Sequence, residues 1–207
     1  MTKIYNVFIV DDDEAVRDSL RMMLKAAGCN VTVFSSADEF LSVCKDNTLG
    51  CLILDVNMPG MNGPALQEEL NRRGSRLPII FLTGQGSIPL SVRTLKAGAM
   101  DFLTKPVDGT ELLNCVKLAL DKCVELQEQA FESQFIAKRL AALTGREKEV
   151  MTLIIKGLTS KEVAVRLGIS FRTVENHRAQ VMQKTGASNM LELAHLVSHS
   201  RESLLPR

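Results

Sequence analysis

The sequence predicts an α/β domain, with five parallel strands in a doubly wound sheet, followed by a small all-α domain of four helices. In about the first 120 residues, short apolar runs alternate with stretches of helical periodicity, as in parallel sheets covered on both faces. Beyond residue 140 only helical periodicity remains. The charge also changes sign, because residues 1–124 hold 13 Lys and Arg against 15 Asp and Glu, whereas residues 140–207 hold 10 against 6. A basic second domain makes a polyanion such as nucleic acid a candidate partner.

The composition narrows the class of protein. A chain of 207 residues allows one large domain or two small ones, and 45% hydrophobic residues are enough for a core. No stretch approaches the roughly 18 apolar residues of a membrane span, and the first residues lack the apolar segment of a secretion signal. The five cysteines are widely spaced without a C-x-x-C pair, which is typical of reduced thiols. We therefore predict a cytoplasmic protein with no membrane partner.

Five apolar runs are the predicted strands, at residues 7–10, 31–34, 51–55, 78–83 and 102–103. The third is the most informative. Cys51 to Leu54 are apolar without alternation, Asp55 closes the run, and Pro59-Gly60 begins a turn. Asp55 is therefore predicted at the carboxyl end of a buried strand, where open α/β sheets bind their ligands.

A helix is predicted after each strand, from helical periodicity and from the residues at its ends. The first helix is predicted to end at Gly28, and the second to begin after Ser35 or Ser36. The third begins near Ala65, the fourth covers about residues 89–97, and the fifth begins near Gly109 or Thr110. Strict alternation of five strands and five helices predicts the doubly wound parallel sheet.

Polar side chains stand at the carboxyl ends of four predicted strands. Asp11 and Asp12 follow the first strand, Asp55 ends the third, Thr83 the fourth and Lys105 the fifth. These ends converge on one crevice in such a sheet. Three carboxylates repel one another unless a cation joins them, and oxygen ligands without His or Cys favour Mg²⁺. A hydroxyl and an ammonium suit phosphoryl oxygens, so Asp55 is predicted to be a nucleophile that accepts a phosphoryl group.

This constellation resembles the receiver domain of two-component response regulators, over about residues 4–122. The matching elements are Val10-Asp11-Asp12, Asp55 with Met58-Pro59-Gly60, Thr83, and Lys105-Pro106. The resemblance implies a flavodoxin-like fold in which a sensor histidine kinase phosphorylates Asp55. It also implies that Mg²⁺ is held by Asp11, Asp12, Asp55 and the backbone carbonyl of Asn57.

The resemblance further assigns a switch. Thr83 and Lys105 would bind the phosphoryl group, with Thr83 as the switch hydroxyl. Phe102 occupies the aromatic switch position, although a plain core aromatic would also fit. Lys105-Pro106 is expected to be a cis peptide.

Two further segments are similar to the FixJ group of the NarL/FixJ response regulators. They are residues 83–89 and residues 98–103. Ser87 and Val107 stand where that group often has an acid and Phe. Asp13 is a third consecutive acid with no predicted role.

Residues 123–140 are predicted to be a helical linker between a receiver domain, 1–122, and a DNA-binding domain, 141–207. The segment lacks Gly and Pro, so the fifth helix should extend through it to about Ala142. Gln127 and Ala130 interrupt the apolar spacing, which argues against a sustained coiled coil.

The second domain opens with a predicted capping box, Thr144 with Glu147 three residues later. The first helix is predicted to end at Gly157, the second to run from Thr159 or Ser160 to Gly168, and the third to begin after Ser170. The fourth begins near Asn189, with apolar positions at Leu191, Leu193, Leu196 and Val197. Two short helices joined at residues 167–170 form a helix-turn-helix, whose second helix lies in the DNA major groove. Its inner face is Val174, Val181 and Met182.

The segment resembles the LuxR-type DNA-binding domain. The matching residues are Leu143-Thr144, Arg146-Glu147, Gly157, Lys161-Glu162-Val163-Ala164, Leu167, Ser170, Thr173-Val174-Glu175, His177 and Lys184, whereas Thr185 and Met190 depart from the usual pattern. Helical geometry turns Glu175, Asn176 and Ala179 outward as candidates for base contacts. Phosphate contacts are predicted for Lys161, Arg172, Thr173, Arg178 and Lys184.

The predicted function is a transcription factor, not an enzyme, that is activated by phosphorylation of Asp55. Phosphorylation is expected to produce a homodimer through the fourth helix and fifth strand, where Arg93 and Asp101 carry opposite charges. Promoter DNA and RNA polymerase are the further predicted partners. Relief of inhibition in a resting monomer is the alternative route. A haloacid-dehalogenase-type phosphohydrolase would need an acid where Asn57 stands, and an RNA-binding module would not explain the helix-turn-helix.

Overall fold

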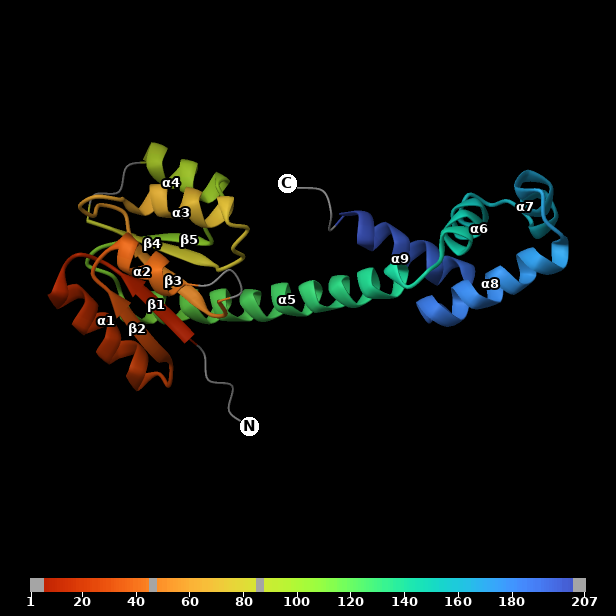
Figure 1. The fold of residues 1–207 in the computed structure, drawn as a ribbon. Helices are drawn as coiled ribbons and strands as arrows, with labels where there is room; N and C mark the ends of the chain where they lie inside the picture. The colour runs from red at the N-terminus through yellow and green to blue at the C-terminus, as the bar shows by residue number, and fades with distance from the viewer. Residues whose placement is uncertain (1–5, 45–47, 85–87, 203–207) are drawn as a thin grey trace. The chain divides into compact units, whose positions relative to one another are not determined.

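The computed structural model of the chain describes residues 6–44, 48–84 and 88–202 (Figure 1). The chain divides into two compact units, Met1–Gln127 and Glu128–Arg207. The strands of the first unit are β1 (Asn6–Val10), β2 (Asn30–Phe34), β3 (Cys51–Asp55), β4 (Ile79–Thr83) and β5 (Asp101–Thr104). All five predicted strands are confirmed, and no end is displaced by more than one residue.

The sheet order is β2-β1-β3-β4-β5, and every neighbouring pair is parallel. This is the flavodoxin-like doubly wound order, as predicted. The helices are α1 (Glu14–Ala26), α2 (Ala37–Val43), α3 (Gly63–Arg72), α4 (Ile88–Lys96) and α5 (Gly109–Ala141). Helices α1 and α5 pack on one face of the sheet, and α2 and α3 pack on the other with α4 (Figure 1).

Strand β3 explains why its sequence is apolar without alternation. Cys51 and Ile53 pack with α1 and α5, whereas Leu52 and Leu54 pack with α2 and α3. Both faces of the strand are therefore buried, as is usual in the middle of a parallel sheet. Its last residue, Asp55, lies at the carboxyl edge of the sheet.

The ends of the helices follow from local chemistry. Asp13 is the N-cap of α1, and its carboxylate accepts hydrogen bonds from the backbone N–H groups of Ala15 and Val16, at 2.8 and 3.4 Å. The third consecutive acid thus has a structural role that the sequence analysis did not assign. Gly28 follows α1 with φ +85°, and Ser36 is the N-cap of α2, both as predicted.

Helix α5 continues from the core of the first unit into the second, which confirms the predicted extension of the fifth helix. It runs from Gly109 to Ala141, and the boundary between the units falls inside it. In its second half Phe131 and Phe135 are exposed, whereas Ile136 is buried.

The second unit adds α6 (Gly145–Ile155), α7 (Ser160–Leu167), α8 (Phe171–Thr185) and α9 (Met190–Glu202). Capping boxes begin α6 and α7, from Thr144 with Glu147 and from Thr159 with Glu162. The turn between α7 and α8 passes through Gly168 in the left-handed conformation, with φ +64°. The four helices and the helix-turn-helix are therefore confirmed.

One side chain of the second unit differs from the predicted pattern. The apolar positions of α9 were expected to include Leu191, Leu193, Leu196 and Val197. Leu193 is fully buried, and Leu196 and Val197 pack beside it, but Leu191 is 74% exposed. Leu191 is the second residue of α9, so it projects away from the core that the later turns reach.

The structure also describes the cysteines and the hydropathy of the helices. All five cysteines are free thiols, and Cys51 and Cys115 are buried. In the part of the chain that the structure describes, every helix is too short or too polar to span a bilayer.

Candidate functional site

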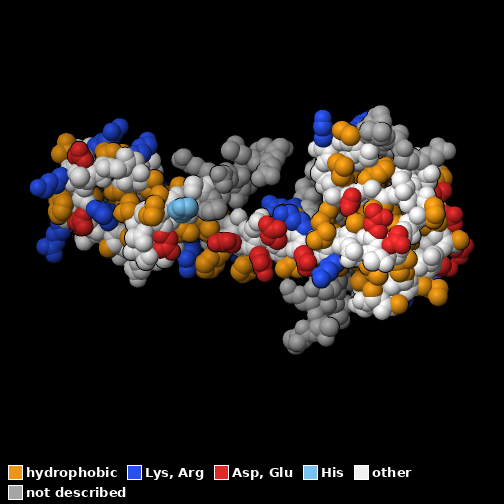
Figure 2. Space-filling view, turned by 180° about the vertical axis from the view of Figure 1, so that it is seen from behind, with side chains coloured by type: hydrophobic (Ala, Val, Ile, Leu, Met, Phe, Trp, Pro, Cys, Tyr) orange, Lys and Arg blue, Asp and Glu red, His pale blue; other side chains and the backbone are white. Residues whose placement is uncertain are grey.

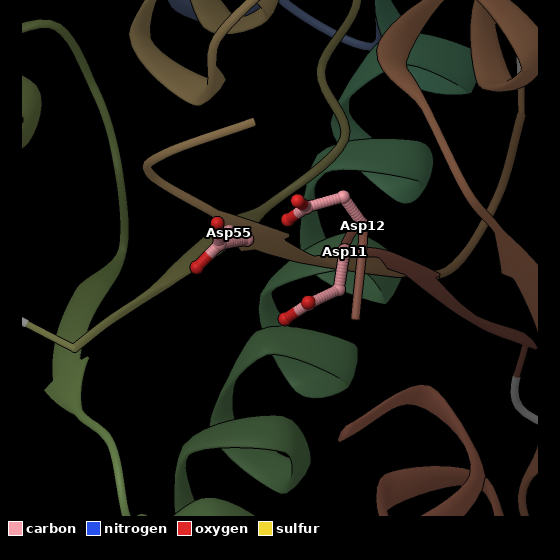
Figure 3. A group of neighbouring side chains, drawn as sticks. All are labelled: Asp11, Asp12 and Asp55. Atoms are coloured by element: carbon pink, nitrogen blue, oxygen red, sulfur yellow. The ribbon is translucent and has the colours of Figure 1, made fainter. Parts of the chain in front are cut away.

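Three carboxylates meet at the carboxyl edge of the sheet. Asp11 and Asp12 follow β1, Asp55 ends β3, and the side chains of Asp11 and Asp12 extend toward that of Asp55 (Figure 3). One carboxylate oxygen from each lies within 4.8 Å of the others. Asp11 and Asp55 are buried, whereas Asp12 is exposed. The strands β1 and β3 are neighbours, so the parallel register brings together residues 44 positions apart.

A single ammonium bridges the two buried carboxylates. Lys105 follows β5, and its Nζ lies 2.6 Å from Asp11 Oδ2 and 2.8 Å from Asp55 Oδ1. The side chain of Lys105 is 22% exposed, so the ammonium is screened from bulk water on most sides. The peptide bond between Lys105 and Pro106 is cis, as predicted.

The electrostatics of the site leave Asp55 less acidic than an ordinary Asp. Burial raises the pKa of Asp55, and the neighbouring Asp11 raises it further, while the Lys105 ammonium works in the opposite direction. For Lys105, burial works to lower the pKa, but the two carboxylates outweigh it and the pKa is raised. The site is therefore a region of crowded negative charge, only partly compensated by one ammonium.

Backbone N–H groups and a close turn fix the orientation of the two buried carboxylates. Asp55 Oδ2 accepts a hydrogen bond from the N–H of Asn57 at 3.0 Å, and Asp11 Oδ1 accepts one from the N–H of Asp13 at 3.0 Å. Gly63, the first residue of α3, lies against the strand end. A Cβ there would be 2.3 Å from the carbonyl oxygen of Asp55. This close approach was not predicted from the sequence.

The predicted switch residues lie on the two strands that follow β3 in the sheet order, β4 and β5. Thr83 ends β4 and is fully buried. Phe102 in β5 is half-buried, and its ring centroid lies 6.2 Å from that of Phe81 in β4. Residues 85–87, which contribute to the FixJ-like pattern, lie outside the described residues.

The second unit carries the predicted DNA-contacting face on α8. Val174 and Val181 are fully buried, whereas Arg172, Glu175, Asn176, Ala179 and Gln183 are exposed. This confirms the predicted division of α8 into an inner and an outer face. Figure 2 shows Lys and Arg side chains gathered around the end of this unit that α7 and the start of α8 form. Within the described part of the chain, Lys161 and Arg172 form no ion pair.

Two other predicted phosphate contacts are engaged inside the unit. Arg178 Nη1 donates to Ser160 Oγ at 2.5 Å and lies 3.4 Å from Glu175 Oε1. Lys184 Nζ lies 2.8 Å from both carboxylate oxygens of the buried Glu147. The phosphate contacts of Arg178 and Lys184 stay predictions, and both cations would have to leave these partners to make them.

Comparison with known families defines the class of protein. Residues 7–117 match the response regulator receiver domain, and residues 141–197 match the luxR family of bacterial regulatory proteins. The chain therefore belongs to the two-component response regulators that carry a DNA-binding helix-turn-helix, a family of transcription factors and not of enzymes. The cluster of Asp11, Asp12 and Asp55 is the acidic pocket typical of such a receiver.

Individual relatives match along almost the whole chain. The transcriptional regulatory protein FixJ of Azorhizobium caulinodans is 41% identical over 190 residues, which are 92% of this chain and 90% of the relative. The response regulator TodT of Pseudomonas putida is 37% identical and covers 96% of this chain and 87% of its own length. Among solved structures, the response regulator StyR is 40% identical, with a TM-score of 0.84 over 95% of this chain and 99% of that one.

Proposed function

We propose that Asp55 accepts a phosphoryl group from a sensor histidine kinase, and that this modification controls binding to promoter DNA. The observation that carries the proposal is the bridge from Lys105 Nζ to Asp11 and Asp55. It sets a nucleophilic carboxylate beside a fixed positive charge at the edge of the sheet. An ammonium held beside Asp55 in this way is suited to bind the oxygens of an incoming phosphoryl group.

The donor set also fits a divalent cation. Asp11, Asp12 and Asp55 offer oxygens alone, and these lie close enough together to share one ion. Oxygen ligands of this kind favour Mg²⁺, and we propose that the backbone carbonyl of Asn57 completes the protein ligands. Bound there, Mg²⁺ would neutralise charge between the carboxylates and the phosphoryl oxygens.

The proposed reaction moves one phosphoryl group. A carboxylate oxygen of Asp55 attacks phosphorus, an O–P bond forms, and the N–P bond of the kinase phosphohistidine breaks. The released imidazole nitrogen is left with the electron pair and takes a proton from water. Lys105 stays beside the new acyl phosphate, and we propose that the hydroxyl of Thr83 then turns toward it as the switch, followed by the ring of Phe102.

The first prediction tests the phosphoacceptor. Asp55→Asn should abolish acid-labile phosphate incorporation from a small phosphodonor, because the amide nitrogen is not a nucleophile. In the wild type, incorporation should require Mg²⁺ and stop when a chelator is added. Asp18→Asn, an exposed change on α1 whose carboxylate pairs with Arg21, is the matched control. Full labelling of Asp55→Asn would remove the assignment.

Phosphorylation is proposed to act through a homodimer formed by α4 and β5. Val92 and Leu95 of α4 are 45% and 43% exposed, which gives this surface apolar area to bury. The charged contact expected between Arg93 and Asp101 has competitors within the chain. Arg93 donates to Glu68 at 2.8 Å, and Asp101 Oδ1 accepts from the N–H of Phe102 at 2.8 Å. Dimerisation through these charges would require Arg93 to exchange partners.

A second prediction therefore concerns assembly. After treatment with the phosphodonor and Mg²⁺, the wild-type chain should sediment as a dimer and bind DNA more tightly than before, because two DNA-binding domains then reach the same duplex. Arg93→Glu should prevent both changes, and Glu68→Gln, which frees Arg93, should not. A phosphorylated monomer that binds DNA tightly would instead support relief of inhibition.

The proposed DNA contacts follow from the exposed face of α8 and the start of α7. Lys161, Arg172 and Thr173 are proposed to contact phosphates, which position the domain without reading sequence. Glu175, Asn176 and Ala179 are proposed to contact base edges, because residues near the start of a recognition helix reach them. We also propose that RNA polymerase is a partner of the protein and that the protein acts in the cytoplasm.

A further inference from the structure

Arg178 joins the two helices of the helix-turn-helix. It lies in the middle of α8, and its Nη1 donates to the hydroxyl oxygen of Ser160, the first residue of α7, at 2.5 Å. The same nitrogen lies 3.4 Å from Oε1 of Glu175, one turn earlier on α8. Ser160 is 6% exposed, so the guanidinium is anchored at a buried point.

Glu175 stands at the fifth residue of α8, with its side chain 45% exposed. We infer that Arg178 is a positioning residue for sequence readout, which holds the Glu175 carboxylate in place to accept a hydrogen bond from a cytosine amino group. The inference rests on the proposed base contact of Glu175 and deepens it. It assigns Arg178 a role other than the phosphate contact that its charge alone suggests.

Charge explains why Glu175 needs such a neighbour. A carboxylate that enters the major groove approaches two rows of phosphates, whose field repels it. A guanidinium beside the carboxylate offsets part of that repulsion and limits the orientations the flexible side chain can adopt. A contact that is preorganised in this way discriminates between bases better than a mobile one.

The anchoring of Arg178 separates it from the other cations of the domain. Its side chain is 34% exposed, and its nearest contact is a hydroxyl inside the domain. Lys161, at the second residue of α7, is exposed and forms no ion pair within the described residues. Lys161 therefore has the freedom that a phosphate contact requires, and it serves as the matched control for Arg178.

The test uses the full-length chain, phosphorylated with a small phosphodonor and Mg²⁺. Its base preference is measured by selecting binding sites from random-sequence duplexes. Affinity for the selected site is then measured over a series of salt concentrations. The variants are Glu175→Gln, Arg178→Ala, Ser160→Ala and Lys161→Ala, and each is checked for folding by circular dichroism.

Arg178→Ala should relax preference at the same base pair as Glu175→Gln, by roughly fivefold or more, and leave the salt slope unchanged. In the Glu175→Gln background, Arg178→Ala should change the preference no further. Ser160→Ala, which keeps the guanidinium but removes its anchor, should relax that base pair by a smaller factor. Lys161→Ala should weaken every sequence alike and lower the salt slope by about one for each bound protomer.

Three results would overturn the inference. Arg178→Ala could behave as Lys161→Ala does, with uniform loss and a reduced salt slope, which would make Arg178 a phosphate contact. If Arg178→Ala does not fold, the test rests on Ser160→Ala. An unchanged base preference in Ser160→Ala would also overturn the inference. An unchanged preference in Glu175→Gln would instead show that the proposed base contact is wrong, and the positioning role would fall with it.

Discussion

The receiver and the DNA-binding domain each contain a lysine that pairs with a buried carboxylate, and the two pairs behave oppositely. Lys105 lies 2.8 Å from Asp55, and Lys184 lies 2.8 Å from Glu147. Both carboxylate side chains are 6% exposed. Yet the pKa of Asp55 is raised, whereas the pKa of Glu147 is lowered.

The neighbours of each carboxylate account for the difference. Glu147 has both oxygens on Lys184 and accepts a further hydrogen bond from the N–H of Thr144 at 2.7 Å. These donors stabilise the charged form and lower its pKa. Asp55 shares its lysine with Asp11, and burial dominates its pKa. One pair is thus a satisfied structural contact, and the other has an excess of negative charge that suits it to bind a cation and a phosphoryl group.

The largest expected effect comes from breaking the satisfied pair. Glu147→Gln removes the charge that binds Lys184 and weakens the capping box of α6. The slowest backbone amides of α6 and α8 should then exchange roughly tenfold faster or more. Hydrogen exchange followed by mass spectrometry reads the two domains separately in the full chain. Residues 7–117 should be unaffected.

A pH series sharpens this prediction. Because the pKa of Glu147 in the folded domain lies below the ordinary 4.5, its stabilisation is complete above pH 4.5 and is lost as the pH falls below it. The difference between wild type and Glu147→Gln should therefore shrink in acid, after correction for intrinsic exchange. Glu149→Gln, whose partner Arg146 is exposed, is the control and should change little. Equal protection in both variants would contradict a structural role for the Glu147–Lys184 pair.

Glu147 shows which contacts could be predicted from the sequence alone and which could not. Thr144 and Glu147 are three residues apart, so their capping box was predictable from local spacing. The contact of Glu147 with Lys184 joins residues 37 positions apart, and it depends on how α6 packs on α8. Sequence reasoning therefore assigned Lys184 by its charge, as a candidate phosphate contact. The same limit applies to Arg178, whose partner Ser160 lies on another helix.

The receiver site was more predictable, because its residues are placed by the topology of the sheet and not by the details of side-chain packing. Once the apolar runs predict a doubly wound sheet, the carboxyl ends of its strands must lie along one edge, and Asp11, Asp55 and Lys105 are expected at that edge. The N-cap role of Asp13 was within reach of the same reasoning, since Asp before a helix is a common capping signal. The tight contact of Gly63 with the end of β3 was not, because it depends on how the backbone of the turn folds back onto the strand.

The smallest expected effect comes from the pair of Asp55 with Lys105, and here the substitution should raise stability instead of lowering it. Asp55→Asn removes a carboxylate whose pKa is raised above 3.8, so the folded receiver should become more stable at neutral pH. Lys105 keeps its contact with Asp11 at 2.6 Å, so little of the attraction is lost, while the repulsion between Asp11 and Asp55 disappears. The slowest amides of residues 7–117 should exchange roughly two- to fivefold more slowly than in the wild type.

The stability gained by Asp55→Asn should depend on pH and Mg²⁺, and this dependence tests whether repulsion between carboxylates is the cause. A carboxylate with a raised pKa destabilises the fold only once it is ionised, so the advantage of Asp55→Asn should vanish as the pH falls toward 3.8 and grow as it rises. Mg²⁺ should slow exchange in the wild-type receiver and have a smaller effect on Asp55→Asn, because the variant has lost one of the ligands. If Asp55→Asn is instead less stable at neutral pH, attraction to Lys105 outweighs crowding among the carboxylates. The receiver pair would then be a structural contact like that of Glu147 with Lys184.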